Sequence, residues 1–395
     1  MTHFCLRSCI LVAVLSAFAQ SAYSQNTEYG AGALYSNTTG ADNSAFGIDA
    51  LYANTTGNEN TASGFQALYV NTDGSYNTAS GHQALYTNTS GSANTASGFD
   101  ALYYNTTGYD NTASGIGALY ANTTGINNTA SGSYALEYNT TGNYNTALGT
   151  NALYHNTIGE ANNASGYQAL PFNTTGNYNE ASGHDALYSN TSGSGNEASG
   201  HAALFSNTTG SYNVAVGYAA GYDQTTGSNN IYISHRGAAG ESGVTRIGTS
   251  GTQTETYIAG IENAKITGSV VYVTSSGQLG VLASSERYKT GITPIGTISE
   301  KLRQLRPVSF HLKTDPKGAV QYGLIAEEVT KVYPELVIRD DKGKIQGVRY
   351  DELAPMLLNE VQEQAVQIRD LKKLVVKMQA GLIELQAKDQ LVARH

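Results

Sequence analysis

A serine and a lysine five residues apart, Ser284 and Lys289, stand at the point where the chain changes character. Such a pair can form a minimal acyl-transfer site, in which the lysine amine is the general base and the serine hydroxyl attacks a carbonyl carbon. The spacing alone is a weak signal, because serines lie near lysines in most proteins. The context is more informative: a repetitive sequence precedes the pair, and an ordinary small-domain sequence follows it.

Charge is distributed unevenly along the 395 residues, whose formal net charge is -9. No Lys or Arg occurs between Arg7 and Arg236, and residues 26–229 hold 13 of the 31 acidic residues. A segment without cations cannot neutralise phosphates, so we expect neither nucleic acid nor an anionic membrane as its partner. The length leaves room for two or three domains.

The first 24 residues have the pattern of a secretory signal peptide. Arg7 precedes an apolar stretch at 10–19, and residues 22–24 form a small-x-small cleavage site. The apolar stretch is too short to span a bilayer, and we expect no later span. Cys5 and Cys9 both fall within this segment, so the mature chain would have no disulfide. We therefore expect a protein that is secreted or held at the cell surface.

Residues 25–229 consist of a 17-residue repeat, N-T-A-S-G-x-x-A-L-Y-x-N-T-T-G-x-x, whose positions we call columns 1 to 17. Glycine fills column 5 from Gly30 to Gly217 and column 15 from Gly40 to Gly227. A fixed short period with two constant glycines, and without apolar residues at 3.6 spacing, predicts a parallel β-solenoid with one unit per coil. Two short extended segments are expected in each unit, N-T-A-S-G and A-L-Y-x-N-T. Column 1 is asparagine at Asn26, Asn43, Asn60, Asn77, Asn94, Asn111, Asn128, Asn145, Asn162, Asn179, Asn196 and Asn213.

The predicted core of this solenoid is thin. Each coil offers two alanines and one leucine, such as Ala62, Ala67 and Leu68. Burial of one leucine contributes about 1.5–3 kcal/mol, whereas ordering of the backbone opposes folding by about 1–2 kcal/mol per residue. We therefore expect several chains to pack together, with the column-10 tyrosines at or over the surface between chains. These are Tyr35, Tyr52, Tyr69, Tyr86, Tyr103 and Tyr120.

The repeat allows other interpretations. Hydrogen-bonded ladders and turns explain the column-12 asparagines that lie in N-x-[ST] sequons more simply than glycosylation does. These are Asn37, Asn54, Asn88, Asn105, Asn122, Asn139, Asn173, Asn190 and Asn207. Adjacent threonines in a strand point to opposite faces, which argues against an ice-binding plane. His82, His184 and His201 share column 6 with Phe65 and Phe99, which argues for packing or surface and against a metal site. The acidic residues are scattered, so no carboxylate pair for glycoside hydrolysis stands out.

After the repeats we expect three further parts. Residues 230–283 form a β-rich connector with strands at 231–233, 256–258, 270–273 and 278–281. Residues 284–353 form a small α+β domain with strands at 308–312, 321–325, 335–338 and 346–350 and a short helix ending near Val329.

Residues 354–395 form a helix whose apolar seam alternates spacings of four and three, which is typical of a coiled coil. Ile and Val lie on one row of this seam and Leu on the other, a pattern that would by itself favour a dimer. The seam is Leu357, Val361, Ile368, Leu371, Val375, Met378, Leu382, Leu385 and Val392, with Gln364 and Asp389 at polar seam positions.

Several motifs in this order resemble the peptidase S74 family, the intramolecular chaperone domain of phage endosialidase tailspikes that also occurs in a eukaryotic membrane-bound transcription factor. The similarity covers roughly residues 284–375. The motifs are S-S-E-R-Y-K at 284–289, Y-G-L-I-A-E-E-V at 322–329, Y-P-E-L-V at 333–337 and Y-D-E-L-A-P-M-L-L at 350–358. The repeats are more loosely similar to the β-roll heads of trimeric autotransporter adhesins, although the repeat length differs and their membrane barrel is lacking.

The resemblance implies a mechanism. The C-terminal domain trimerises, aligns three chains so that the fibre winds in register, and cuts itself off between Ala283 and Ser284. Ser284 would be the nucleophile and Lys289 the base. The family usually has Asp after the serine, where this chain has Ser285. An aspartate that positions the lysine or the scissile bond would matter for the rate of cleavage and not for the assembly of the trimer.

We therefore expect a secreted homotrimeric fibre of adhesin type with a self-cleaving C-terminal chaperone, and neither cofactor nor metal. Its partners would be its own copies and a glycan or other cell-surface ligand. One alternative is a carbohydrate-binding or carbohydrate-degrading spike, which a unique acidic cleft would support. Another is a C-terminal domain that only trimerises, with Ser284 and Lys289 inert.

Overall fold

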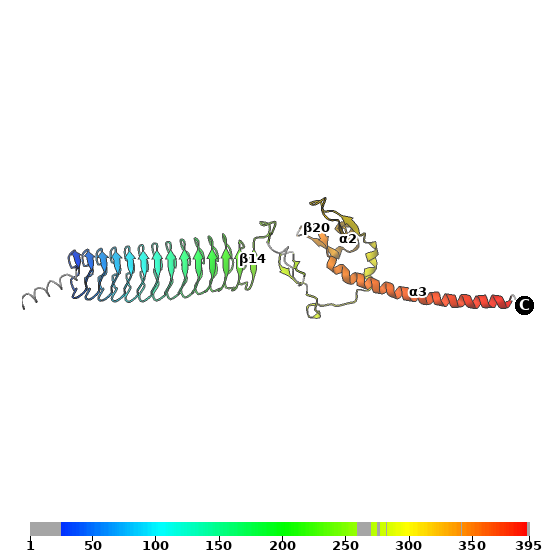
Figure 1. Ribbon diagram of the computed structural model, residues 1–395, viewed down its shortest axis with the longest axis horizontal. Helices are drawn as coiled ribbons and strands as arrows, with labels where there is room; N and C mark the ends of the chain where they lie inside the picture. The colour runs from blue at the N-terminus through cyan, green and yellow to red at the C-terminus, as the bar shows by residue number, and fades with distance from the viewer. Residues whose placement is uncertain (1–24, 259–269, 275–276, 282, 341, 393–395) are drawn as a thin grey trace, which may run out of the picture. The chain divides into compact units, whose positions relative to one another are not determined.

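The computed structural model describes residues 25–258, 270–274, 277–281, 283–340 and 342–392 (Figure 1). The expected signal peptide lies outside these residues. The chain divides into two compact units, with the boundary after Tyr257. Each unit is described by itself.

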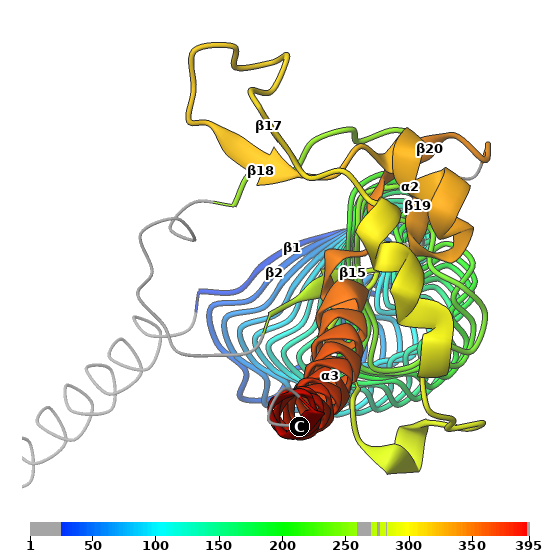
Figure 2. The same ribbon diagram turned by 90° about the vertical axis from the view of Figure 1, so that its right-hand side faces the viewer.

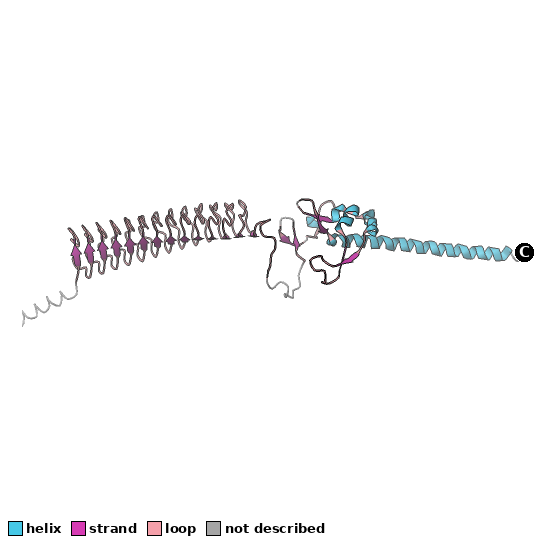
Figure 3. Ribbon diagram, turned by 90° about the horizontal axis from the view of Figure 1, so that it is seen from above, coloured by secondary structure: helices cyan, strands magenta, loops and turns pink. Residues whose placement is uncertain are grey.

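The first unit is a parallel β-solenoid, as predicted. Its strands form one 14-stranded sheet in which neighbours in space are consecutive in sequence (Figures 1 and 3). From β1 to β13 each strand residue pairs with the residue 17 positions later, as Ala62 does with Ala79. The strands are β1 (Thr27–Tyr29), β2 (Ser44–Phe46), β3 (Thr61–Ser63), β4 (Thr78–Ser80), β5 (Thr95–Ser97), β6 (Thr112–Ser114), β7 (Thr129–Ser131), β8 (Thr146–Leu148), β9 (Asn163–Ser165), β10 (Glu180–Ser182), β11 (Glu197–Ser199), β12 (Val214–Val216), β13 (Ile231–Ile233) and β14 (Thr245–Ile247).

Each coil contains one strand. The prediction of a second extended segment at A-L-Y-x-N-T is therefore wrong. That segment is a series of turns in which the leucine adopts a left-handed conformation, with φ of 52° at Leu68 and 54° at Leu85. Its amide still bonds to the next coil: Leu68 N donates to Ala84 O at 3.0 Å. The backbone ladder is thus kept without extended geometry, which offsets the roughly 1–2 kcal/mol that a left-handed residue costs.

The core is the predicted one. Ala62, Ala67 and Leu68 and their equivalents along the rod are fully buried. Viewed along the rod in Figure 2, the coils lie one behind another. Equivalent residues pair directly from coil to coil, as Ala62 does with Ala79 and Ala79 with Ala96. The core also contains two columns of buried asparagine, columns 1 and 12. Asn60 Nδ2 donates to Asn43 Oδ1 at 3.1 Å and to Gly74 O at 2.9 Å. The prediction of asparagine ladders is confirmed.

The two glycine columns are constant for different physical reasons. In column 5, Gly81 has φ of 142°, and a Cβ there would lie 2.2 Å from Gly98 O in the next coil. In column 15, Gly91 has no such dihedral angle, but its Cβ would lie 2.3 Å from Asn88 Oδ1 and 2.4 Å from Gly108 O. Backbone conformation and close approach both select glycine in the first column, and close approach alone selects it in the second.

The C-terminal end of the solenoid is closed by the first cations after the repeats. Tyr232 takes the place of the column-3 alanine in β13 and is fully buried. Arg236 pairs with Asp223 at 2.8 Å and lies over the Tyr222 ring. Arg246, in β14, pairs with Glu241 at 2.7 Å. The ring of Tyr232 therefore fills the end of the core, where β2 to β12 have alanine, and the two ion pairs lie around it.

The connector continues the sheet only as far as β14, which pairs with β13 at a spacing of 14 residues. The strand expected at 256–258 does not form, because this exposed segment has no neighbouring strand to pair with among the described residues. In the second unit, β15 (Tyr272–Val273) and β16 (Leu279–Gly280) form a short antiparallel pair.

The rest of the second unit is a small α+β domain, as predicted. Its core contains Val329, Tyr333, Leu336, Val348 and Met356, among others. The elements are η1 (Glu286–Tyr288), η2 (Gly296–Gln304), β17 (Val308–Phe310), β18 (Gln321–Gly323), α2 (Ala326–Val332), η3 (Pro334–Leu336), β19 (Val337–Arg339), β20 (Ile345–Val348) and α3 (Tyr350–Val392). β17 pairs with β18 and β19 with β20, both antiparallel.

The long helix α3 packs on this core only through its first turns. Leu353, Met356 and Glu360 are buried, and Asn359 Nδ2 donates to Ser299 Oγ at 2.7 Å. Beyond Glu360 the side chains of α3 are exposed. Figure 1 shows this part of the helix as a single straight ribbon. Among the described residues, helices that combine the length and the apolar character needed to cross a membrane are lacking.

Candidate functional site

Ser284 and Lys289 are brought together by one short turn. The 3-10 helix η1 begins after Ser285, where Tyr288 N donates to Ser285 O at 3.0 Å. It ends where Lys289 N donates to Glu286 O at 2.9 Å. This turn separates Ser284 from Lys289, and their side chains meet across it.

The two side chains are within reach of each other. Lys289 Nζ donates a hydrogen bond to Ser284 Oγ at 3.5 Å, and Ala283, Ser284 and Lys289 are all exposed. In this hydrogen bond the amine of Lys289 is the donor and the hydroxyl of Ser284 is the acceptor. General-base catalysis needs the reverse, a neutral amine that takes the hydroxyl proton. Removal of Lys289 from water would favour the neutral amine.

Ser285 occupies the position where the resembled family has an aspartate. It precedes the first residue of η1 with φ of -67° and ψ of 142°, and its side chain makes no cap hydrogen bond. An aspartate here would place a carboxylate between Ser284 and Lys289 in the sequence, where it can pair with the ammonium group. The serine hydroxyl lacks the charge for that pairing.

The domain behind the pair is tied together across distant segments. Tyr333 Oη donates to Ile298 O at 2.7 Å and connects α2 to η2. Asn359 Nδ2 donates to Gly296 O at 2.9 Å and connects α3 to the same η2 segment. Arg303 and the buried Glu360 form an ion pair at 3.2 Å. The start of the long helix is therefore fixed to the domain that follows the Ser–Lys turn.

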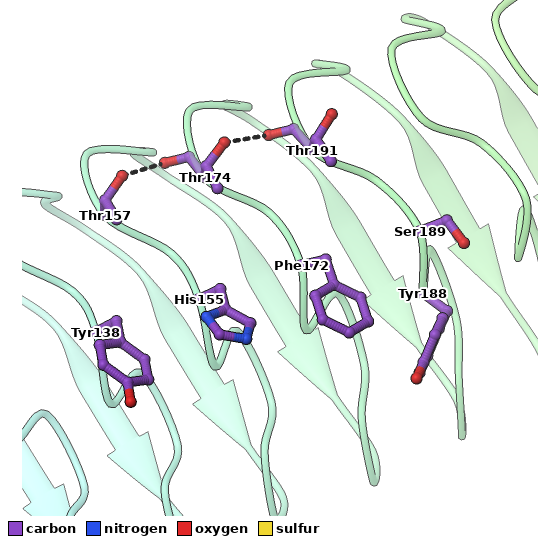
Figure 4. Close-up of a pocket in the computed structure, with 8 residues that line it drawn as sticks. All are labelled: Tyr138, His155, Thr157, Phe172, Thr174, Tyr188, Ser189 and Thr191. Carbon is purple, nitrogen blue, oxygen red and sulfur yellow. Dashed lines mark hydrogen bonds between the residues drawn. The ribbon is translucent and has the colours of Figure 1, made fainter.

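A second feature, which the sequence analysis missed, lies on the solenoid. The ladder of column-10 tyrosines is interrupted where Glu137 and Pro171 replace tyrosine. There the next column supplies the rings: His155 stacks between Tyr138 and Phe172, at 5.3 and 5.4 Å between ring centroids. With Tyr188 and nearby threonines they line a shallow groove (Figure 4). The signal was in the sequence, as aromatic residues in column 11 beside the two departures.

The comparisons with known proteins bear on the second unit. A family model described as chaperone of endosialidase, Peptidase S74, matches residues 284–338. No curated protein and no solved structure matches the chain. The matched segment begins at Ser284 itself and ends in β19, so it contains the Ser–Lys turn and most of the small α+β domain.

Proposed function

We propose that the C-terminal unit is a trimerisation chaperone for a secreted repeat fibre and that it cuts itself from the fibre between Ala283 and Ser284. The observation that carries the proposal is the match to the endosialidase chaperone family, which starts on the serine that directly follows the proposed cut. The Ser–Lys contact at 3.5 Å supports the chemistry.

A repeat fibre of this kind needs help with register. Successive coils present the same columns: Ala62 pairs with Ala79, which pairs with Ala96. If chains assemble side by side, a shift of one chain by a whole coil changes almost none of the contacts, so the register is weakly specified. A non-repetitive domain that trimerises first would align the chains before the coils pack.

The helix α3 has an apolar seam with which further copies of the chain could pack. Its seam residues are between 51% and 66% exposed in one chain: Leu357, Val361, Ile368, Leu371, Val375, Met378, Leu382 and Leu385. The side chain of Val392, also expected in the seam, lies outside the described residues. An exposed apolar row of this length marks an interaction surface. Further apolar side chains off the seam, Leu358, Val366, Leu374, Val376 and Ile383, are exposed as well. Three copies packed along the seam would supply the proposed trimer.

The proposed cleavage uses the described atoms in a defined order. Ser284 Oγ attacks the carbonyl carbon of Ala283, while Lys289 takes the hydroxyl proton and passes it to the departing backbone nitrogen of Ser284. The peptide bond is thereby exchanged for an ester between Ala283 and Ser284. Water then hydrolyses the ester, which leaves a carboxylate on Ala283 and a free amino group on Ser284.

Assembly would switch this chemistry on. In one chain both side chains face water. Packing of neighbouring chains around the turn would remove Lys289 from water and favour the neutral base. Cleavage would then report that three chains have assembled correctly.

The oligomeric state tests the chaperone part. We expect the uncleaved chain, prepared as Ser284→Ala, to sediment as a trimer and the same chain with Leu371→Asp to sediment as a monomer, because a buried charge at the centre of the seam is unfavourable. Gln367→Asp in the same Ser284→Ala chain is the matched control, since it adds the same single negative charge at an exposed position beside the seam and should stay trimeric. A monomeric Ser284→Ala chain, or a trimeric Leu371→Asp variant of it, would contradict the proposal.

Export rests on the first 24 residues, whose pattern is that of a signal peptide. The proposal expects the exported protein to begin at Gln25. Sequencing of the N-terminus of the protein recovered from the medium or the cell surface checks this. A protein that keeps Met1 and stays inside the cell would remove export from the proposal.

A second candidate function, glycan binding, is favoured by the aromatic groove in Figure 4. The stacked rings of Tyr138, His155 and Phe172 present a row of partly exposed edges, against which the apolar faces of sugar rings can pack. We expect the trimer to bind a subset of an oligosaccharide array and Phe172→Ala to lose that binding. Phe99→Ala, an exposed ring elsewhere on the solenoid, is the control. Equal binding by both variants would exclude the groove.

A further inference from the structure

Two histidines lie side by side on the solenoid, in column 6 of consecutive coils. The rings of His184 and His201 are stacked with centroids 5.0 Å apart and planes inclined by 11°. Tyr167 stacks on the outer face of His184 at 5.1 Å, and Tyr218 stacks on that of His201 at 5.3 Å. Both histidines are exposed, so their ring nitrogens can be reached from solvent.

A carboxylate completes the cluster. Asp185 Oδ2 lies 3.0 Å from His184 Nδ1. Its other oxygen, Oδ1, is buried and has no hydrogen-bond partner among the described residues. A buried carboxylate oxygen without a partner is costly, and a cation would satisfy it. Asp185 is in a left-handed conformation, with φ of 57°, as column 7 is in most coils. The fold itself therefore fixes the backbone that carries the carboxylate.

We propose that His184, Asp185 and His201 bind one divalent transition-metal ion of the zinc type. Each offers one ligand atom, and the three atoms lie within 4.8 Å of one another. In tetrahedral zinc sites the ligand atoms are about 3.4 Å apart, from bond lengths of about 2.1 Å. Small rotations of these side chains would bring the ligand atoms from separations of up to 4.8 Å to the spacing of a zinc site. Two imidazoles and one carboxylate are ligands that zinc favours, and they leave a fourth position open to water or to a further ligand.

The arrangement differs from the other histidine positions on the solenoid. His82 in the same column stacks between Phe65 and Phe99 and has one carboxylate near it, Asp100 at 3.7 Å. It therefore offers one imidazole where the proposed site offers two. Column 6 holds His, Phe or Tyr in coils of the same fold, so His→Phe changes in this column should leave the fold intact.

Calorimetric titration of the full chain with Zn²⁺ tests the site. The protein is prepared without a polyhistidine tag and freed of metal with a chelator. We expect one high-affinity ion per chain and at least about a tenfold loss of affinity in His184→Phe, His201→Phe and Asp185→Asn. His82→Phe is the matched control and should bind as wild type does. The inference is overturned if wild type shows no such ion, or if His184→Phe and His201→Phe bind it unchanged.

Chemical protection gives a second readout that needs no variant. Carbethoxylation of histidine by diethyl pyrocarbonate, mapped by peptide mass, should modify His184 and His201 in the metal-free trimer and spare them when Zn²⁺ is bound. His82 should react equally in both conditions. Equal modification of His184 and His201 with and without Zn²⁺ would also overturn the site.

Discussion

Asn71 donates a hydrogen bond from Nδ2 to Asn54 Oδ1 at 2.7 Å, and both side chains are fully buried. The same Nδ2 donates to Gly74 O at 3.0 Å, and Asn71 Oδ1 accepts from Asn88 Nδ2 at 2.8 Å. One amide therefore closes a turn within its own coil and links it to the coils on both sides. The solenoid is held by such polar columns as much as by its thin row of alanine and leucine.

Removal of one amide from the column should be costly. Asn71→Ala leaves Asn54 Oδ1, Gly74 O and Asn88 Nδ2 with a bond missing in a buried setting, and each unsatisfied group costs about 1–3 kcal/mol. We expect a loss of several kcal/mol, measured by denaturant unfolding. Asn163→Ala, which removes an exposed amide in β9, should change the free energy of unfolding by less than about 0.5 kcal/mol. Similar values for the two variants would show that the buried column is not a main source of stability.

The column-5 glycines should tolerate no side chain. Gly81→Ala combines a φ of 142° with a Cβ that would lie 2.2 Å from Gly98 O, so the coils would have to separate locally. Hydrogen exchange should show lost protection in the strands on either side, β4 and β5. Gly240→Ala keeps a positive φ of 71°, but the new methyl would meet no described atom within 4 Å. It should cost only about 1 kcal/mol, and an equal loss in both variants would argue against close packing of the coils.

Acid should loosen the C-terminal end of the solenoid. Hydrogen bonds from Arg246 lower the pKa of Glu241 below its ordinary value. The folded state therefore keeps this carboxylate ionised at pH values where the unfolded chain would protonate it. The stabilisation is complete above the unfolded pKa, about 4.3, and is lost as pH falls through the lower folded pKa.

Hydrogen exchange in β13 and β14 between pH 3 and pH 6 measures this effect. Protection should fall steeply at the acid end in wild type, after correction for the intrinsic exchange rate. Glu241→Gln cannot ionise and should give lower protection with a flatter pH dependence. A wild-type profile as flat as that of Glu241→Gln would contradict the assigned role of the ion pair.

Much of the solenoid could be predicted from the repeat. The period, the parallel pairing, the buried Ala62, Ala67 and Leu68 and the asparagine columns all follow from identical residues at a fixed spacing. The turns around Leu68 could not, because a left-handed leucine is rare and local preference favours an extended segment for A-L-Y-x-N-T. The frequent Asp, Asn and Gly in column 7 were the available sign of left-handed backbone there.

The candidate site was predicted only in part. The motif identified Ser284 and Lys289, and the structure places their side chains in contact across η1. The sequence could not show that both face water in one chain, because exposure depends on what packs around the turn. The aromatic groove was missed, because it depends on which columns come together in neighbouring coils, and a repeat read one unit at a time does not show this. The shared column of His184 and His201 was identified but interpreted as packing or surface, because the sequence does not show the carboxylate of Asp185 beside both rings.

Ser285 offers a direct test of the chemistry beside Ser284. Ser285→Asp would place a carboxylate next to the scissile Ala283–Ser284 bond. A carboxylate favours the charged form of a nearby lysine, but we expect its positioning of the scissile bond to outweigh this effect on the base, and so to give at least roughly a tenfold faster cleavage. A time course of cleavage after expression measures the rate. Ser285→Asn, of the same size but uncharged, should cleave no faster than wild type, and a Ser285→Asp rate at or below that of wild type would contradict this role.

The intact mass of the purified protein, beside Ser284→Ala and Lys289→Ala, tests the proposed self-cleavage most directly. The account predicts two fragments from wild type, a fibre ending at Ala283 and a C-terminal piece of residues 284–395, while both variants remain full length and trimeric. A wild-type chain that stays uncut as a trimer, or variants that are cut like wild type, would contradict the Ser–Lys mechanism. The second unit would then be a trimerisation domain without chemistry of its own.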